Sequence, residues 1–155
     1  MTDPQTSPGR IAGIDFGTVR IGIAVSDARQ SIASPYENYT RRGPEGDAKR
    51  FEQLVKEEEI RLFVVGLPIH GDGRESKKSQ EARRFGKWLG EKTGVPVEFF
   101  DERYTSVEAE QHLLSAELSS KRRKARLDML AAQILLQAYL ESKSRGQTRP
   151  LGLDE

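Results

Sequence analysis

Residues 62–65 read Leu-Phe-Val-Val, and this unbroken apolar run is typical of a β-strand covered on both faces. The segment before it, 48–59, has apolar residues at helical spacing, and so does the segment after it, 76–92. A buried strand between two helices predicts a parallel crossover, with helices packed against a sheet. We therefore expect part of the sheet to be parallel.

An antiparallel portion is predicted nearer the N-terminus. Residues 10–15 and 20–26 read as two short strands, and apolar residues alternate along the second. Only residues 16–19 separate them, which is short enough for a hairpin. Residues 32–39 favour a third strand, although Pro35 indicates a sheet edge or a bulge.

The remaining elements complete an α/β fold class. Residues 95–100 predict a last strand, and 105–116 and 128–140 predict helices. The expected architecture is a five-stranded mixed sheet, with three antiparallel hairpin strands plus two parallel strands, flanked by helices. Residues 10–141 would form one domain, preceded by a flexible lead at 1–9 and followed by a disordered polar tail at 142–155, which shows no periodicity.

Composition excludes several classes of protein. The chain has 155 residues, which suits one hydrophobic core, and it contains no cysteine, so disulfides and thiolate metal sites are excluded. No apolar run approaches the roughly 20 residues that span a bilayer, so we expect a cytoplasmic protein with no membrane partner. Formal net charge is only +1, so any attraction to nucleic acid must come from where the charges lie.

Four acidic residues fall where functional groups gather in α/β folds. Asp15 ends the first predicted strand, Asp101 and Glu102 end the last, and Asp128 opens the last helix. Carboxylates that converge repel one another unless a cation lies between them, and Mg²⁺ or Mn²⁺ prefers such hard oxygen ligands. One or two ions held there can activate a water molecule against a phosphodiester.

Each acid also has an ordinary interpretation. Asp15 is compatible with a turn, Asp101 or Glu102 with an ion pair to Arg103, and Asp128 with a helix cap. The spacing of these acids along the sequence does not by itself indicate a metal site. The local motifs around them are needed to support that interpretation.

Several residues near these acids are candidates for binding phosphate. Thr18 lies between the first two strands, and Arg20 and Arg103 can make bidentate contacts to phosphate oxygens. The run 119–126 directly precedes Asp128, and we expect it to be a mobile basic loop that grips a nucleic-acid backbone. Its five basic residues are Lys121, Arg122, Arg123, Lys124 and Arg126. The alternative is a solvated surface.

Four local motifs, in order, resemble those of YqgF-type (RuvX) proteins. Residues 15–22 resemble the family's opening D-x-G-x-x-x-x-G, and 65–68 with 71–73 resemble its V-G-L-P and D-G segment. Residues 101–105 are similar to its D-E-R-x-T signature, and 128–135 to its final D-x-x-A-A-x-x-I-L helix. The match spans about residues 11 to 141.

The resemblance implies an RNase H-like fold, related to Holliday junction resolvases, and a role in maturing the 5′ end of precursor 16S rRNA. Asp15, Glu102 and Asp128 would be the catalytic, metal-binding carboxylates, with Asp101 a second candidate because one sequence does not fix the register of that strand end. Related resolvases carry a fourth acid about three residues after the last aspartate, where this chain has Ala131. A site with three acids in place of four would weaken the inference that this chain shares the activity of those resolvases.

Other functions stay open at this point. A DNA junction resolvase would act on branched DNA as a dimer, whereas an RNA nuclease could be a monomer or a homodimer and could act on ribosomal particles. Residues 14–18 also resemble the phosphate loop of actin-like ATPases and sugar kinases, but those enzymes need two such domains and 155 residues hold one. A non-catalytic RNA-binding ribosome-assembly factor is a third class, and the retained carboxylates argue against it.

Overall fold

The structure is a computed structural model that describes residues 9–69, 72–104 and 120–145, with the backbone alone at 120–128 and at 145. The helix predicted over 105–116 lies outside this part of the chain, as do residues 1–8 of the predicted lead and 146–155 of the predicted tail. No helix in the described part is long and apolar enough to span a membrane.

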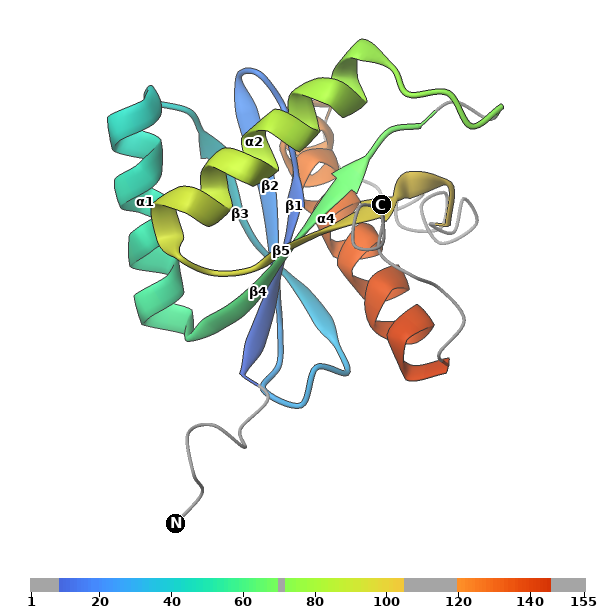
Figure 1. Cartoon of the computed structure of the whole chain (residues 1–155), viewed down its shortest axis with the longest axis horizontal. Coiled ribbons are helices and arrows are strands. Elements are labelled where there is room, and N and C mark those ends of the chain that lie inside the picture. The colour runs from blue at the N-terminus through green and yellow to red at the C-terminus, as the bar shows by residue number, and fades with distance from the viewer. Residues whose placement is uncertain (1–8, 70–71, 105–119, 146–155) are drawn as a thin grey trace.

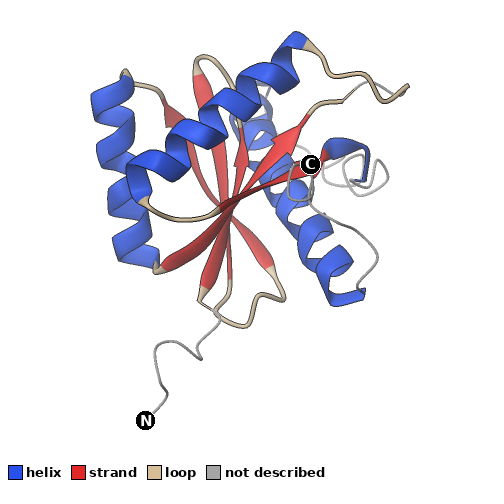
Figure 2. Ribbon diagram, in the orientation of Figure 1, coloured by secondary structure: helices blue, strands red, loops and turns tan. Residues whose placement is uncertain are grey.

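Five strands form one mixed sheet in the order β3-β2-β1-β4-β5 (Figure 2). The hairpin strands pair antiparallel, β1 with β2 and β2 with β3, whereas β4 runs parallel to β1 and β5 parallel to β4. This arrangement confirms the predicted fold class, three antiparallel strands plus two parallel ones. The bounds are β1 Arg10–Asp15, β2 Arg20–Ser26, β3 Ala33–Thr40, β4 Ile60–Leu67 and β5 Val97–Asp101.

Helices cover both faces of the sheet. The helices α1 (Pro44–Glu58) and α2 (Lys77–Thr93) pack on one face, and α4 (Ser120–Arg145) crosses the other (Figure 1). A short 3₁₀ turn, η1 (Glu102–Tyr104), follows β5. The continuous apolar run in β4 is explained by this layering, because a central strand has no face toward water.

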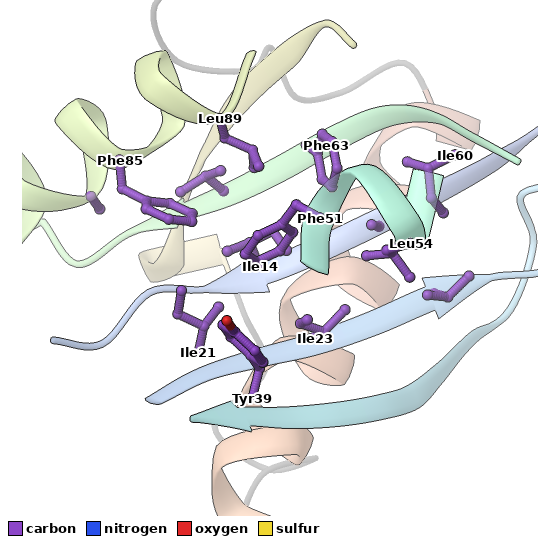
Figure 3. Close-up of a cluster of buried hydrophobic side chains, with 14 of the residues drawn as sticks. Ile14, Ile21, Ile23, Tyr39, Phe51, Leu54, Ile60, Phe63, Phe85 and Leu89 are labelled. Carbon is purple, nitrogen blue, oxygen red and sulfur yellow. The ribbon is translucent and has the colours of Figure 1, made fainter. Parts of the chain in front are cut away.

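The alternation of side chains along β1 divides the core into two clusters. Ala12 and Ile14 face α1 and α2, where Phe51 and Phe85 also pack (Figure 3). Ile11 packs on the opposite side with residues of α4. Side chains two residues apart share a face in a strand, so Asp15, at the end of β1, lies on the α4 side of the sheet.

The helix α4 differs most from expectation. A helix was predicted over 128–140, but α4 begins at Ser120 and ends at Arg145. The prediction of a mobile loop at 119–126 is therefore wrong from Ser120 onward, because Lys, Arg and Ala are good helix formers and extend the last helix backwards. At the other end, the helix continues four residues beyond the expected domain boundary at residue 141, and Ser142 in this extension is buried.

Candidate functional site

Two of the predicted carboxylates meet at the carboxyl ends of the parallel strands. The strand β4 lies between β1 and β5, with Ile14 opposite Val65 on one side and Leu67 opposite Asp101 on the other. Asp15 ends β1 and Glu102 follows β5, and both line one cavity of about 690 Å³. The topology thus brings together two acids that are 87 positions apart in the sequence.

Gly66 of β4 provides the space between these two acids. A Cβ atom built on Gly66 would lie 3.2 Å from Cγ of Glu102 and 3.0 Å from Cδ2 of Leu135. Both contacts are tighter than ordinary van der Waals contact, so any larger residue would press on the glutamate. A glycine here keeps the middle of the cavity open to a ligand.

The turn between β1 and β2 forms another wall of the cavity. Thr18 and Arg20, the predicted phosphate ligands of this segment, both line it and are exposed. Gly17 permits the turn, because a Cβ atom there would lie 2.3 Å from the backbone oxygen of Arg20. The backbone at residue 17 approaches that of residue 20 too closely to leave room for a side chain, and this explains the glycine in the first motif.

Asp101 occupies a different environment from Glu102. It is buried, its Oδ1 accepts a 2.8 Å hydrogen bond from the backbone N–H of Arg103, and its Oδ2 accepts a 2.7 Å bond from Arg103 Nε. Hydrogen bonding to Asp101 raises the pKa of the Arg103 guanidinium. Asp101 is absent from the lining of the Asp15–Glu102 cavity, and it orders the strand end on which Glu102 sits.

Asp128 lies in the half of α4 that points toward this site. Lys143 donates to Oε1 of Gln30 at 3.3 Å, at the end of the sheet remote from Asp15. Eight positions earlier, Leu135 lies against Gly66. The helix therefore runs from the Asp15 end of the sheet toward the opposite end, and residue 128 belongs to its first half. Its side chain, like those of the basic residues 121–126, is outside the described part.

The comparison with protein families matches residues 9–142 to RuvX, described as a Holliday junction resolvase. The chain belongs to the RuvX family. A curated relative from Rhodopirellula baltica, named as a candidate pre-16S rRNA nuclease, is 48% identical over 146 residues, which are 94% of this chain and 84% of the relative. A relative of the same name from Koribacter versatilis is 39% identical over 97% of this chain and 99% of its own length.

Solved structures agree on the fold of this RuvX chain. Thermus thermophilus RuvC in complex with a Holliday junction substrate matches with a TM-score of 0.59 at 17% identity, over 92% of this chain and 99% of RuvC. The yeast mitochondrial Holliday junction resolvase Ydc2 matches with a TM-score of 0.50 at 10% identity, over 90% of this chain and 80% of its own. At such identities the likeness shows the fold alone, and it confirms the RNase H-like architecture.

The RuvX assignment confirms two predictions made from the sequence. The resemblance found in four motifs is confirmed by a family match over residues 9–142. RuvX is a family of nucleases, so the predicted enzyme class, a hydrolase acting on phosphodiester bonds, is confirmed as well.

The structure adds two charged residues to the site that the motifs did not indicate. Lys78 and Glu81, from the first turns of α2, line the same cavity as Asp15. They lie one helical turn apart, and in the sequence they look like ordinary charges on a solvated helix face. Only the packing of α2 above β4 reveals that they face the site, so no local signal could have found them.

Proposed function

We propose that this RuvX family member is a divalent-metal-dependent nuclease that cleaves precursor 16S rRNA near its 5′ end. The observation that carries the proposal is the convergence of Asp15 and Glu102 in one cavity, on either side of Gly66. Nothing in the apolar core requires these acids, since both stand beyond the last residue pairs that join their strands to β4. Their position is that of a ligand-binding site at the carboxyl ends of parallel strands.

The donor set fits Mg²⁺ or Mn²⁺. Asp15 and Glu102 supply hard carboxylate oxygens, and two carboxylates directed into one cavity favour a bound cation. Asp128, carried by α4, would be the third ligand of one or two ions. Among the residues with described side chains, no group of three acids or histidines could hold a metal, and the side chain of Asp128 is not one of them. When bound, the ion supplies Lewis-acid polarisation of a phosphoryl oxygen.

Other side chains of the cavity would hold the strand. Thr18 and Arg20 line one wall and Lys78 another, so hydroxyl and cationic donors surround the space beside the carboxylates. Such groups bind phosphate oxygens without reading sequence. The basic residues 121–126 in the first turns of α4 would extend this contact along the backbone of the substrate.

The substrate is inferred from the relatives. Proteins named as candidate pre-16S rRNA nucleases match this chain at 48% and 39% identity over most of its length. We extend their named substrate to this chain, with ribosomal particles in the cytoplasm as the setting for the reaction.

The test is a cleavage assay that offers fragments of precursor 16S rRNA and a synthetic four-way DNA junction side by side, with Mg²⁺ or Mn²⁺. Wild-type protein should cut the RNA, and Asp15→Asn, which removes one anionic ligand, should lose about 100-fold or more of that rate. An Asp15→Asn protein that cuts RNA at the wild-type rate would contradict the proposal.

Junction resolution is the second candidate, favoured by the family's description as a Holliday junction resolvase. It requires symmetric nicks in two strands and therefore two active sites in one complex. Preferential symmetric nicking of the junction, by a protein that is dimeric in sedimentation experiments, would move the assignment from RNA to DNA.

A further inference from the structure

A second, smaller cavity adjoins the Asp15–Glu102 cavity. It has a volume of about 290 Å³ and lies between the start of α1 and the middle of α2. Phe16 and Glu81 line both cavities, so the two are neighbours with a shared wall. Neither the proposed metal chemistry nor the family motifs give this second cavity a role.

Three aromatic rings line the second cavity in succession. The ring centroids of Phe16 and Phe85 are 4.9 Å apart, and those of Phe85 and Trp88 are 5.5 Å apart. Phe85 is buried, but Phe16 and Trp88 are only half-buried. Phe16 and Trp88 therefore keep part of their rings accessible, and flat rings beside a phosphate-binding region can serve as platforms for nucleobases.

A fixed arginine faces the same rings. The Arg41 guanidinium carbon lies 5.3 Å from the Phe16 centroid and 5.7 Å from the Phe85 centroid. It is held there because Nε donates to Asp47 at 3.1 Å, while the backbone N–H of Arg41 donates to the backbone oxygen of Val19 at 3.0 Å. A guanidinium plane held against aromatic rings is itself a surface on which a base can stack.

An exposed cationic side chain stands at the second cavity. Arg41 and Arg84 line it with Glu81, and the charge of Arg41 is paired with Asp47, so Arg84 is the arginine placed to attract a nucleic acid. Arg84 is exposed on α2, where it can reach a phosphate beside a bound base. The volume of about 290 Å³ lies at the lower end of the range of small-molecule pockets and leaves room for a single base.

We propose that this second cavity, the base pocket, binds one unpaired nucleobase of the nucleic-acid substrate, next to the phosphate held in the Asp15–Glu102 cavity. The inference rests on the proposed nuclease function and adds a substrate preference to it. A base in a duplex is stacked and paired, whereas an unpaired base is free to enter and stack on Trp88. The enzyme therefore selects strands with an unpaired nucleotide beside the cleavage point.

Trp88 allows a direct measurement, because it is the only tryptophan in the chain. Its fluorescence is recorded during titration with an eight-nucleotide single strand, RNA or DNA, and with the same strand annealed to its complement. EDTA prevents cleavage, and the anisotropy of a dye on the strand reports binding independently. We expect quenching at least twofold greater with the single strand than with the duplex, both compared at saturation.

Substitutions locate the contact. Arg84→Gln should weaken single-strand binding about 3- to 30-fold, and Trp88→Leu about 5- to 100-fold, as expected when a cationic or stacking interaction is removed. The matched control is Arg29→Gln, which removes the same charge from an exposed turn at the opposite end of the sheet and should leave binding unchanged. Thermal melts verify that each variant is folded, and Arg84 is exposed enough to be replaced without disturbing the core.

Different results would contradict the base pocket and the proposed nuclease function. Equal quenching by duplex and single strand, binding without quenching, or no binding of the single strand contradicts the base pocket. So does cleavage that depends on Asp15 but is unchanged by both Arg84→Gln and Trp88→Leu. Cleavage that is indifferent to Asp15→Asn contradicts the nuclease site instead, whatever the fluorescence shows.

Discussion

At the scale of single residues, the site depends on which of two adjacent acids faces the cavity. Asp101 is buried against Arg103, whereas Glu102 lines the cavity with Asp15. The motif that contains both acids does not separate them, because the outcome depends on where β5 ends relative to β4. Gly66 then decides whether the cavity between Asp15 and Glu102 stays open.

Gly66→Ala should impair catalysis more than stability. The new methyl group would lie 3.2 Å from Cγ of Glu102 and displace its carboxylate, and misplacement by a fraction of an ångström to 1 Å costs about 10- to 100-fold in rate. Cleavage rate and melting temperature are measured together. The control is Gly90→Ala, whose methyl group would lie 3.3 Å from Val97, away from the site. A Gly66→Ala protein with wild-type cleavage would show that Glu102 is not constrained by Gly66.

Asp47 couples the acid stability of the protein to the base pocket. Its buried carboxylate accepts hydrogen bonds from the Tyr39 hydroxyl at 2.6 Å, the Arg42 backbone N–H at 2.8 Å and Arg41 Nε at 3.1 Å. Burial by itself would raise the pKa of Asp47, but these donors outweigh it and the pKa is lowered. Arg41 is thereby held in place beside Phe16.

The pH dependence of stability follows from the sign of that shift. The folded-state pKa of Asp47 lies below its ordinary value of 3.8, so its stabilising effect is complete above that value and is lost as the pH falls through the lower folded-state pKa. Asp47→Asn should lose about 1–3 kcal/mol at neutral pH and show a shallower loss of stability in acid. Urea unfolding from pH 7 down to pH 3 measures this. If the free energy of unfolding fell equally with pH in the wild type and in Asp47→Asn, the prediction would be contradicted.

At the scale of elements, α4 is packed unusually close to β1. A Cβ atom on Gly13 would lie 2.7 Å from Cβ of Leu136 and 3.1 Å from the backbone oxygen of Ala132. The sequence indicated the apolar face of this helix but not its start, because a run of Lys and Arg carries no apolar period although its residues favour a helix. Hydrophobic periodicity therefore predicted a start at residue 128, about two turns after the observed start of the helix at Ser120.

Gly13→Ala should push α4 away from the sheet. The contacting atoms are Cβ and backbone atoms of the helix, which cannot rotate aside, so we expect a loss of about 1–3 kcal/mol. Because Asp128 lies on the same helix, cleavage should also fall, even at temperatures where the variant is fully folded. Chemical unfolding and single-turnover cleavage are the measurements. Reduced stability with unchanged cleavage would separate α4 packing from the site.

At the scale of the whole molecule, the order of strands and helices along the chain predicted more of the fold than of the site. Hairpin strands followed by alternating helices and strands were enough to predict the mixed sheet, because right-handed crossovers leave few topologies. The contribution of α2 was missed, since Lys78 and Glu81 have no neighbours in sequence that mark them as part of a cavity. The net charge of +1 likewise conceals a local concentration of cations at 121–126.

That local charge gives a prediction about salt. Replacing Arg122 and Arg123 by Gln should weaken RNA binding and reduce the slope of log affinity against log salt by about 0.7 for each phosphate that these arginines neutralise. Lys49→Gln with Lys56→Gln, on the exposed side of α1, makes the same change in charge elsewhere and should leave the slope unchanged. Binding is measured by fluorescence anisotropy over a range of salt concentrations. Equal slopes for the two double variants would contradict a role for the start of α4.

The proposal that Glu102 and Asp15 together form a metal-dependent nuclease site is tested by the Mg²⁺- or Mn²⁺-dependent rate at which Glu102→Gln cleaves a precursor 16S rRNA fragment. The matched control is Glu57→Gln, the same change on the exposed side of α1. We predict that Glu102→Gln lowers the rate about 100-fold or more while Glu57→Gln leaves it unchanged. Cleavage by Glu102→Gln at the wild-type rate, with both variants folded, would show that Glu102 is not part of the nuclease site.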